Sequence, residues 1–116
     1  MKVIHFREAR SYEPEEGWRR VSLCDEKGIS VEYFIKPPRH SSPMHHHPQE
    51  QVMVVLKGKL KIVSSDGREE VLEEGDAVFI PSDEPHRVEN VLEEPSIGMD
   101  IFTPGRSFDF WLKRRG

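Results

Sequence analysis

The sequence predicts an all-β domain, built as a small barrel or a double sheet. Apolar and polar residues alternate with a period of two rather than the helical period of about 3.6. Turn signals that contain glycine or proline recur at short intervals. The chain has 116 residues, which is enough for one domain with one core. We therefore expect a single domain over residues 1–116, with a barrel core at about residues 18–103.

Eight segments have the alternation and the flanking turns of short strands. We expect them at residues 18–24, 29–36, 51–57, 59–64, 68–72, 77–80, 86–91 and 97–102. Between them, Gly67 and Gly75 tolerate a positive φ, and Pro81 and Pro85 interrupt the hydrogen bonding of a ladder. Short strands with such separators are typical of a small barrel or of two packed sheets.

The two ends of the chain differ from this pattern. The first seventeen residues are heavily charged, and we expect an additional edge strand at residues 3–6. The tail at residues 107–116 has the pattern of a short amphipathic helix. Its Phe108, Trp111 and Leu112 would cover one end of the barrel, and its last turn is basic, which suits a helix C-terminus.

Charge and hydropathy exclude two classes of partner. Lys and Arg number 17 against 21 Asp and Glu, so the net charge is −4 and there is no basic surplus to neutralise a run of phosphates. The longest apolar run, at residues 52–56, is far too short to cross a bilayer, and the N-terminus lacks the apolar core of a signal peptide. We expect a cytoplasmic protein whose partners include neither nucleic acid nor membrane.

Three of the six histidines are consecutive, at His45, His46 and His47. In an extended segment that leads into a strand, side chains alternate between two faces. The residues that then share the face of the core are His45, His47, Gln49, Gln51, Met53 and Val55. Polar side chains without partners would each cost about 1–3 kcal/mol there. A bound metal ion removes that cost, so the pattern predicts a metal site.

A further histidine, His86, begins a later strand and can complete the set of ligands. Two alternatives stay open. Pro48 can bend the chain so that Glu50 turns inward in place of Gln51, or the histidines form an exposed pair beside an unrelated turn histidine. No role follows for His5, His40 and His46.

These residues carry a resemblance to the cupin family. His45, His47, Gln51 and Gly58 follow the spacing of the first cupin motif, with Gln in place of the usual Glu. Residues of the segment 75–90 resemble the second motif: Gly75, Pro81, His86 and Asn90, with Asp83 where a Gly is usual. The resemblance implies a jelly-roll barrel, the cupin-type double-stranded β-helix, over residues 1–116 with a short C-terminal helix or extension.

The resemblance also implies a metal and its ligands. Cupins bind a divalent ion through these positions, so His45, His47, Gln51 and His86 are the implied ligands. Nitrogen and oxygen donors suit Mn, Fe, Co, Ni or Zn. Three neutral imidazoles and a neutral amide leave the charge of +2 uncompensated, which favours anionic molecules such as carboxylates.

A second constellation lies near the end of the chain. Strand alternation places Asp100 and Phe102 on one face, and Arg106 follows after a Pro-Gly turn. A carboxylate that faces a barrel interior is costly unless it is paired or used. An ion pair between Asp100 and Arg106 that pins the C-terminal segment is the plain interpretation.

A more specific resemblance favours a functional role. Together with the first motif, Asp100, Phe102, Pro104 and Arg106 resemble the pectin-degradation group of cupins, which open the ring of 4,5-unsaturated uronic acids. The family's acidic ending after the Arg is replaced here by residues 107–111. The resemblance implies that Asp100 and Arg106 are catalytic and that Phe102 and Arg106 bind a small anionic sugar or sugar acid.

The implied activity is a metal-dependent ring opening, of the lyase or isomerase type, that yields linear 5-keto-4-deoxyuronates. Two alternatives remain: another metal-dependent cupin enzyme, an oxygenase or isomerase of a small acidic metabolite, and a non-catalytic module that binds a metal or a sugar acid. We expect a homodimer, because an N-terminal strand can cover an exposed sheet edge and small cupins are often dimers.

Overall fold

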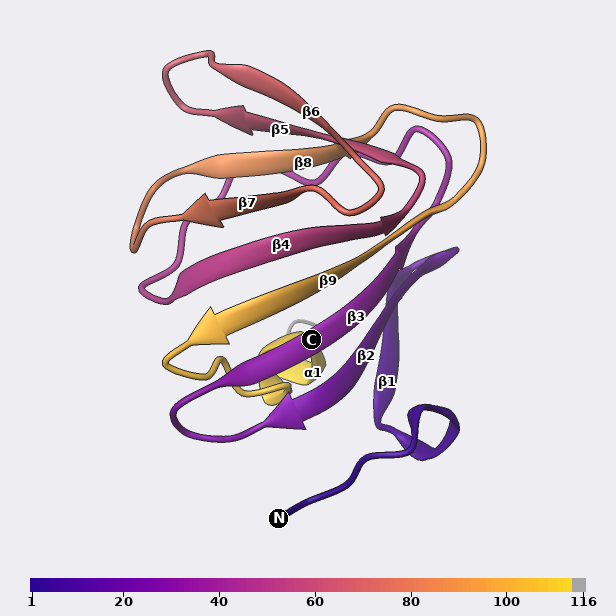
Figure 1. The fold of residues 1–116 in the computed structure, drawn as a ribbon, viewed down its shortest axis with the longest axis vertical. Helices are drawn as coiled ribbons and strands as arrows, with labels where there is room; N and C mark the ends of the chain where they lie inside the picture. The colour runs from indigo at the N-terminus through magenta and orange to yellow at the C-terminus, as the bar shows by residue number, and fades with distance from the viewer. Residues whose placement is uncertain (114–116) are drawn as a thin grey trace.

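The computed structural model describes residues 1–113, which form two facing antiparallel sheets (Figure 1). The strands are β1 (Ser11–Glu15), β2 (Trp18–Asp25), β3 (Ser30–Lys36), β4 (Glu50–Lys57), β5 (Lys59–Ser64), β6 (Glu69–Glu73), β7 (Ala77–Ile80), β8 (His86–Asn90) and β9 (Ser96–Thr103). The larger sheet has the order β1-β2-β3-β9-β4-β7, and the smaller has the order β6-β5-β8. The predicted all-β class and barrel are confirmed.

All eight predicted strands are present, and their ends differ from the prediction by at most one residue. The ends of the chain agree less well. The predicted edge strand at residues 3–6 is wrong, because this part leads into a 3-10 helix, η1 (Phe6–Glu8). The edge strand is instead β1, a polar segment with Pro14 as its fourth residue. Proline is tolerated there because one side of an edge strand makes no ladder hydrogen bonds.

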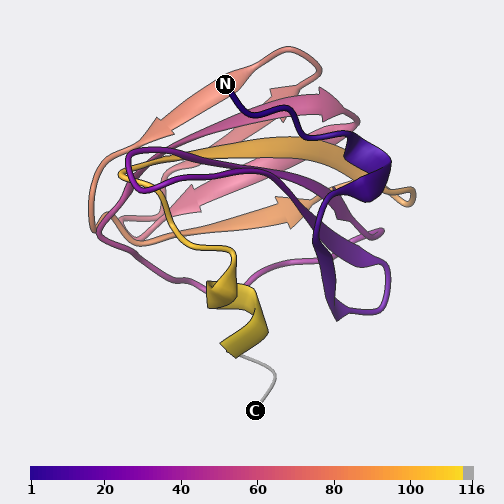
Figure 2. The same cartoon turned by 90° about the horizontal axis from the view of Figure 1, so that it is seen from below.

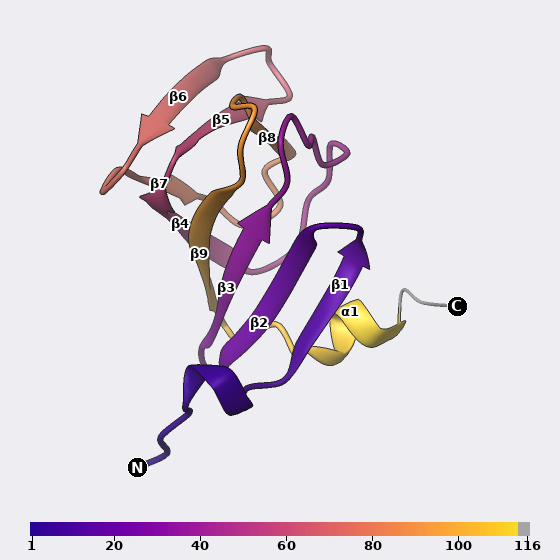
Figure 3. The same ribbon diagram turned by 90° about the vertical axis from the view of Figure 1, so that its right-hand side faces the viewer.

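The predicted C-terminal helix is confirmed as α1 (Asp109–Lys113), and residues 114–116 of the prediction lie outside the described residues. The helix lies beside β1 and β2, away from the smaller sheet (Figures 2 and 3). Phe108 and Trp111 are buried against Trp18, whereas Leu112 is only half-buried. No helix within residues 1–113 is long and apolar enough to span a membrane.

Alternation along β3 and β9 determines what faces the barrel interior. The inward residues of β3 are Ser30, Glu32, Phe34 and Lys36, and those of β9 are Ser96, Gly98, Asp100 and Phe102. The Phe34 ring lies over Gly98, where an added Cβ would come within 2.3 Å of it. Phe34, Met53, Val55 and Leu60 form the apolar core. Polar and charged residues of the same two faces therefore line the remaining space.

Candidate metal centre

The space between the sheets is a cavity lined on one side by histidines and on the other by charged residues. Its lining includes His45, His86 and Gln51, together with inward side chains of β2, β3 and β9. Residues of the C-terminal segment, among them Arg106, complete the wall. The two constellations that are far apart in the sequence therefore meet in one cavity.

Three histidines converge at this cavity. One ligand atom from each of His45, His47 and His86 lies within 4.8 Å of the others. An isolated β-bridge pairs His45 with His86, so the loop before β4 and the start of β8 are held together by backbone hydrogen bonds. The predicted convergence of imidazoles from separated segments is present in the structure.

In each of the three rings Nδ1 contacts a backbone carbonyl, so Nε2 is the nitrogen left to bind a metal. The Nδ1 atoms lie 2.9, 3.0 and 2.8 Å from the backbone carbonyls of Pro43, Gln49 and Glu84, in the order His45, His47 and His86. A carbonyl oxygen only accepts, so each Nδ1 carries the proton and donates it. The Nε2 atom of His86 is buried and has no hydrogen-bond partner among the described residues.

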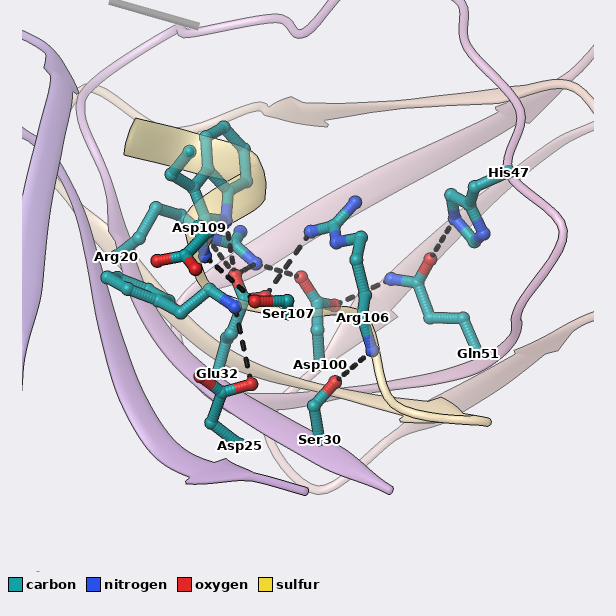
Figure 4. A network of polar contacts seen from close by, with 12 residues as sticks. Arg20, Asp25, Ser30, Glu32, His47, Gln51, Asp100, Arg106, Ser107 and Asp109 are labelled. Carbon is teal, nitrogen blue, oxygen red and sulfur yellow. Dashed lines mark hydrogen bonds and ion pairs between the residues drawn. The ribbon is translucent and has the colours of Figure 1, made fainter. Parts of the chain in front are cut away.

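Gln51 adds an oxygen to this set. Its amide nitrogen donates to Asp100 Oδ1 at 2.8 Å, and its Oε1 lies 2.9 Å from His47 Nε2 (Figure 4). With His47 Nδ1 protonated, both atoms of the second contact are acceptors. Flipping the amide would place its oxygen against the Asp100 carboxylate. Two acceptors would then face each other at Asp100 instead of at His47. A cation shared by His47 and Gln51 removes it, and the residues present therefore fit a divalent metal.

Burial favours the neutral form of His45 and His86. Desolvation, with the nearby His86 and His47 adding to it, lowers the pKa of His45 to about 4. Desolvation also lowers the pKa of His86. Metal binding needs an unprotonated ring nitrogen. His45 and His86 are therefore in the form that a metal requires at neutral pH.

The remaining candidates lie outside the cluster. Glu50 is exposed, whereas Gln51 is only 5% exposed, so Pro48 does not turn Glu50 inward. His46 points away and lies 3.6 Å from Asp83. The last two histidines do not belong to the cluster either. His40 contacts Glu15 at 2.8 Å, and His5 is exposed.

Asp100 is paired with Arg20 rather than with Arg106. Arg20 Nη2 donates to Asp100 Oδ2 at 2.9 Å and to Glu32 Oε1 at 2.6 Å (Figure 4). Arg106 lies 3.5 Å from the other oxygen of Glu32. The plain interpretation of an Asp100–Arg106 pair is therefore wrong. Glu32 and Asp100 stand directly opposite each other on β3 and β9, and Arg20 from β2 separates their charges.

Glu32 is the centre of this cluster, and sequence reasoning missed it. Its side chain is 1% exposed and also accepts from Trp111 Nε1 at 2.6 Å. Burial acts to raise the pKa of Glu32, but Arg20 and Arg106 outweigh burial and hold the pKa below its ordinary value. The sequence feature that could have identified Glu32 is the alternation of residues 30–36, which places it on the same face as the core residue Phe34.

Arg106 is packed against aromatic rings. Its guanidinium carbon lies 4.1 Å from the centroid of the Phe102 ring and 4.2 Å from that of Phe110. Its backbone N–H donates to Ser30 Oγ at 2.8 Å, which fixes the start of the C-terminal segment. Its Nε is buried and has no partner among the described residues. The arrangement holds a planar cation against two aromatic rings.

A protein-family model described as "Cupin domain" matches residues 32–102. No curated protein matches the chain significantly. Several solved structures resemble it. An RmlC-like cupin from Shewanella frigidimarina has a TM-score of 0.83 and 23% identity over 95% of this chain and 96% of that one. KdgF from Halomonas sp. has a TM-score of 0.83 and 22% identity over 95% of this chain and 98% of that one. The polyketide cyclase RemF from Streptomyces resistomycificus has a TM-score of 0.75 and 25% identity over 93% of this chain and 85% of that one.

Proposed function

Because the chain belongs to the cupin family, we propose that it is a metal-dependent enzyme that opens 4,5-unsaturated uronic acids to linear 5-keto-4-deoxyuronates. The observation that carries the proposal is the link from the histidine cluster through Gln51 to Asp100, with Arg106 in the same cavity. The motif resemblance to the pectin-degradation cupins supports the same substrate class. We propose His45, His47, Gln51 and His86 as the metal ligands.

The charges of the cavity favour an anionic substrate. Arg20 and Arg106 balance Glu32 and Asp100, and the proposed ligands are neutral. A divalent ion held by these ligands would supply a fixed positive charge that stabilises negative charge developing on a substrate oxygen. The Nε of Arg106, which has no partner among the described residues, suits a pair with a carboxylate. Phe102, which is 1% exposed, provides an apolar wall beside it.

Asp100 is the proposed acid and base. A carboxylate has about four lone-pair sites, and Arg20 and Gln51 occupy one on each oxygen. In the proposed reaction, an Asp100 oxygen takes the proton of the C1 hydroxyl while the bond from C1 to the ring oxygen breaks. The electron pair of that bond stays on the ring oxygen, which becomes an enolate oxygen at C5. Asp100 then returns a proton to C4, and the 5-keto group forms.

The proposal is tested with a Δ4,5-unsaturated galacturonate. The ultraviolet absorbance of its C4=C5 enol ether is followed with metal-loaded protein, with chelated protein and with buffer alone. We expect a metal-dependent loss well above the spontaneous rate. Decay at the spontaneous rate with metal-loaded protein rejects the ring-opening activity. Binding of the uronate without its loss would identify a sugar-acid binding module, and oxygen uptake would identify an oxygenase.

A further inference from the structure

Lys36 is a buried lysine whose side chain enters the cavity, and neither the metal centre nor the proposed reaction uses it. It is the last residue of β3 and lies opposite Ser96 of β9. The alternation that turns Glu32 and Phe34 inward turns Lys36 inward as well, and its residue is only 2% exposed. It lines the same cavity as His45 and Arg106.

The amine of Lys36 has no counterion. Its Nζ lies 4.9 Å from the centroid of the Trp18 ring and makes no hydrogen bond or ion pair to any residue within 1–113. The charged groups that face it come from four segments: Arg20 of β2, Glu15 of β1, Asp100 of β9 and His40 of the loop after β3. Arg20 already balances Asp100, and Glu15 contacts His40.

A buried cation without a counterion favours its neutral form. Burial, followed by the Arg20 guanidinium, lowers the pKa of Lys36 to about 7. The face of the Trp18 ring favours the ammonium, but it does not offset burial. Amines next to another cation or in an apolar pocket are the ones that proteins use as nucleophiles. Lys36 lies near the Arg20 guanidinium and against the Trp18 ring, and it lines the cavity.

We propose that Lys36 is a nucleophilic amine that captures small aldehydes in the cavity as Schiff bases. The neutral Nζ attacks the carbonyl carbon, a C–N bond forms, and the electron pair of the C=O bond moves to the oxygen. The two N–H protons leave with that oxygen as water, which gives an imine and one water molecule. The apolar walls formed by Trp18 and Phe34 favour this loss of water. This inference is independent of the ring-opening activity.

The test is reductive alkylation of the full chain at pH 7, after treatment with a chelator. Acetaldehyde is the probe, and cyanoborohydride reduces each imine to a stable secondary amine. Peptide mass spectrometry then gives an initial rate for every amine. We expect Lys36 to react at least about tenfold faster than the exposed Lys2 and Lys59, because a group of pKa about 7 is half neutral at this pH. The exposed amino terminus serves as the internal control that the reagent works.

Two variants complete the design. Lys36→Met keeps the length of the side chain and removes the amine, so the fast site should disappear while the other sites keep their rates. Lys61→Met, which removes a lysine paired with Glu89 at 3.3 Å, should leave the fast site unchanged. A Lys36 rate equal to or below that of the exposed lysines in the wild-type protein overturns the proposal. That comparison is made within the wild-type protein, so it does not depend on whether a variant folds. It is also independent of any uronate turnover.

Discussion

Gln51 and Asp100 are joined by a hydrogen bond of 2.8 Å from the amide nitrogen to carboxylate Oδ1. The bond determines which end of the amide faces His47, and it therefore connects the proposed ligands to the carboxylate proposed for proton transfer. A substitution of Gln51 therefore alters both the proposed ligand set and the surroundings of the Asp100 carboxylate. This position is also where the sequence departs from the usual Glu of the first cupin motif.

Gln51→Glu should lower the stability of the metal-free protein. The new carboxylate cannot donate to Asp100 and places a like charge beside it, at an expected cost of about 1–3 kcal/mol. A divalent ion should restore the melting temperature, because it balances the added charge. We expect weaker binding of small carboxylates to the metal-loaded variant. Calorimetric melting with and without metal checks the first point, and unchanged carboxylate affinity would contradict the charge argument.

His47→Ala should abolish metal binding. It removes one of the three converging imidazoles and leaves Gln51 Oε1 without its neighbour. The matched control is His46→Ala, because the side chain of His46 is 65% exposed and contacts only Asp83 at the surface. Elemental analysis of the purified variants gives the metal content per chain. Equal metal content in both variants would remove His47 from the ligand set.

Asp100→Asn should retain metal and fold but lose turnover by about 10²- to 10⁴-fold. The Asn oxygen can still accept from Gln51, so the ligand side of the cavity is preserved, and Arg20 keeps Glu32 as its partner. Asp83→Asn is the control, since the side chain of Asp83 is 64% exposed. The uronate assay and metal analysis are run on both variants. Near-wild-type turnover of Asp100→Asn would show that another group moves the proton.

Much of this site was predictable because it depends on strand parity. Met53 and Val55 had to be inside, and the same parity places His47 and Gln51 inside. The eight main strands followed from the same alternation. Strand β1 did not, because its residues are polar and its stability comes from pairing with β2 and from the contact of Tyr12 with the Trp18 cluster.

Other parts depend on which strands are neighbours. Arg20 reaches Asp100 only because β2 and β9 both flank β3, and this order joins residues that are 80 positions apart. Local patterns suggested Arg106 instead, which is closer in sequence. Glu32 and Lys36 look like solvent-facing charges in isolation. Their burial becomes visible only when the inward face of β3 is known to adjoin a polar cavity.

Trp111→Phe should destabilise the protein by about 1–3 kcal/mol. It removes the donor at 2.6 Å from the buried Glu32 carboxylate, and hydrogen bonds to buried charges are costly to lose. Trp18→Phe is a matched control in the same aromatic cluster, since Trp18 Nε1 is buried and has no partner within residues 1–113. Denaturant unfolding of both variants measures the difference. A larger loss for Trp18→Phe would show that ring packing, rather than the bond to Glu32, dominates.

Lys36 should make the stability of the metal-free protein depend on pH above neutrality. The fold holds the pKa of Lys36 at about 7, below the value of about 10.4 for a lysine in the unfolded chain. Between these values the unfolded chain binds more protons than the folded one, so the free energy of unfolding rises with pH. The limiting slope for one proton is about 1.4 kcal/mol per pH unit. Below pH 7 the folded protein bears the full free-energy cost of burying the charged Lys36 amine. This cost falls as the pH rises, because the buried amine loses its proton.

Comparison with Lys36→Met isolates this contribution, because every other titratable group is the same in both proteins. Denaturant unfolding at pH 6.5, 7.5 and 8.5 should show the wild type gaining stability relative to the variant across the series. Lys61→Met should instead run parallel to the wild type, because Lys61 is partly exposed and paired with Glu89. Parallel curves for the wild type and Lys36→Met would mean that Lys36 keeps its proton when folded, and its amine would then be too rarely neutral to act as a nucleophile.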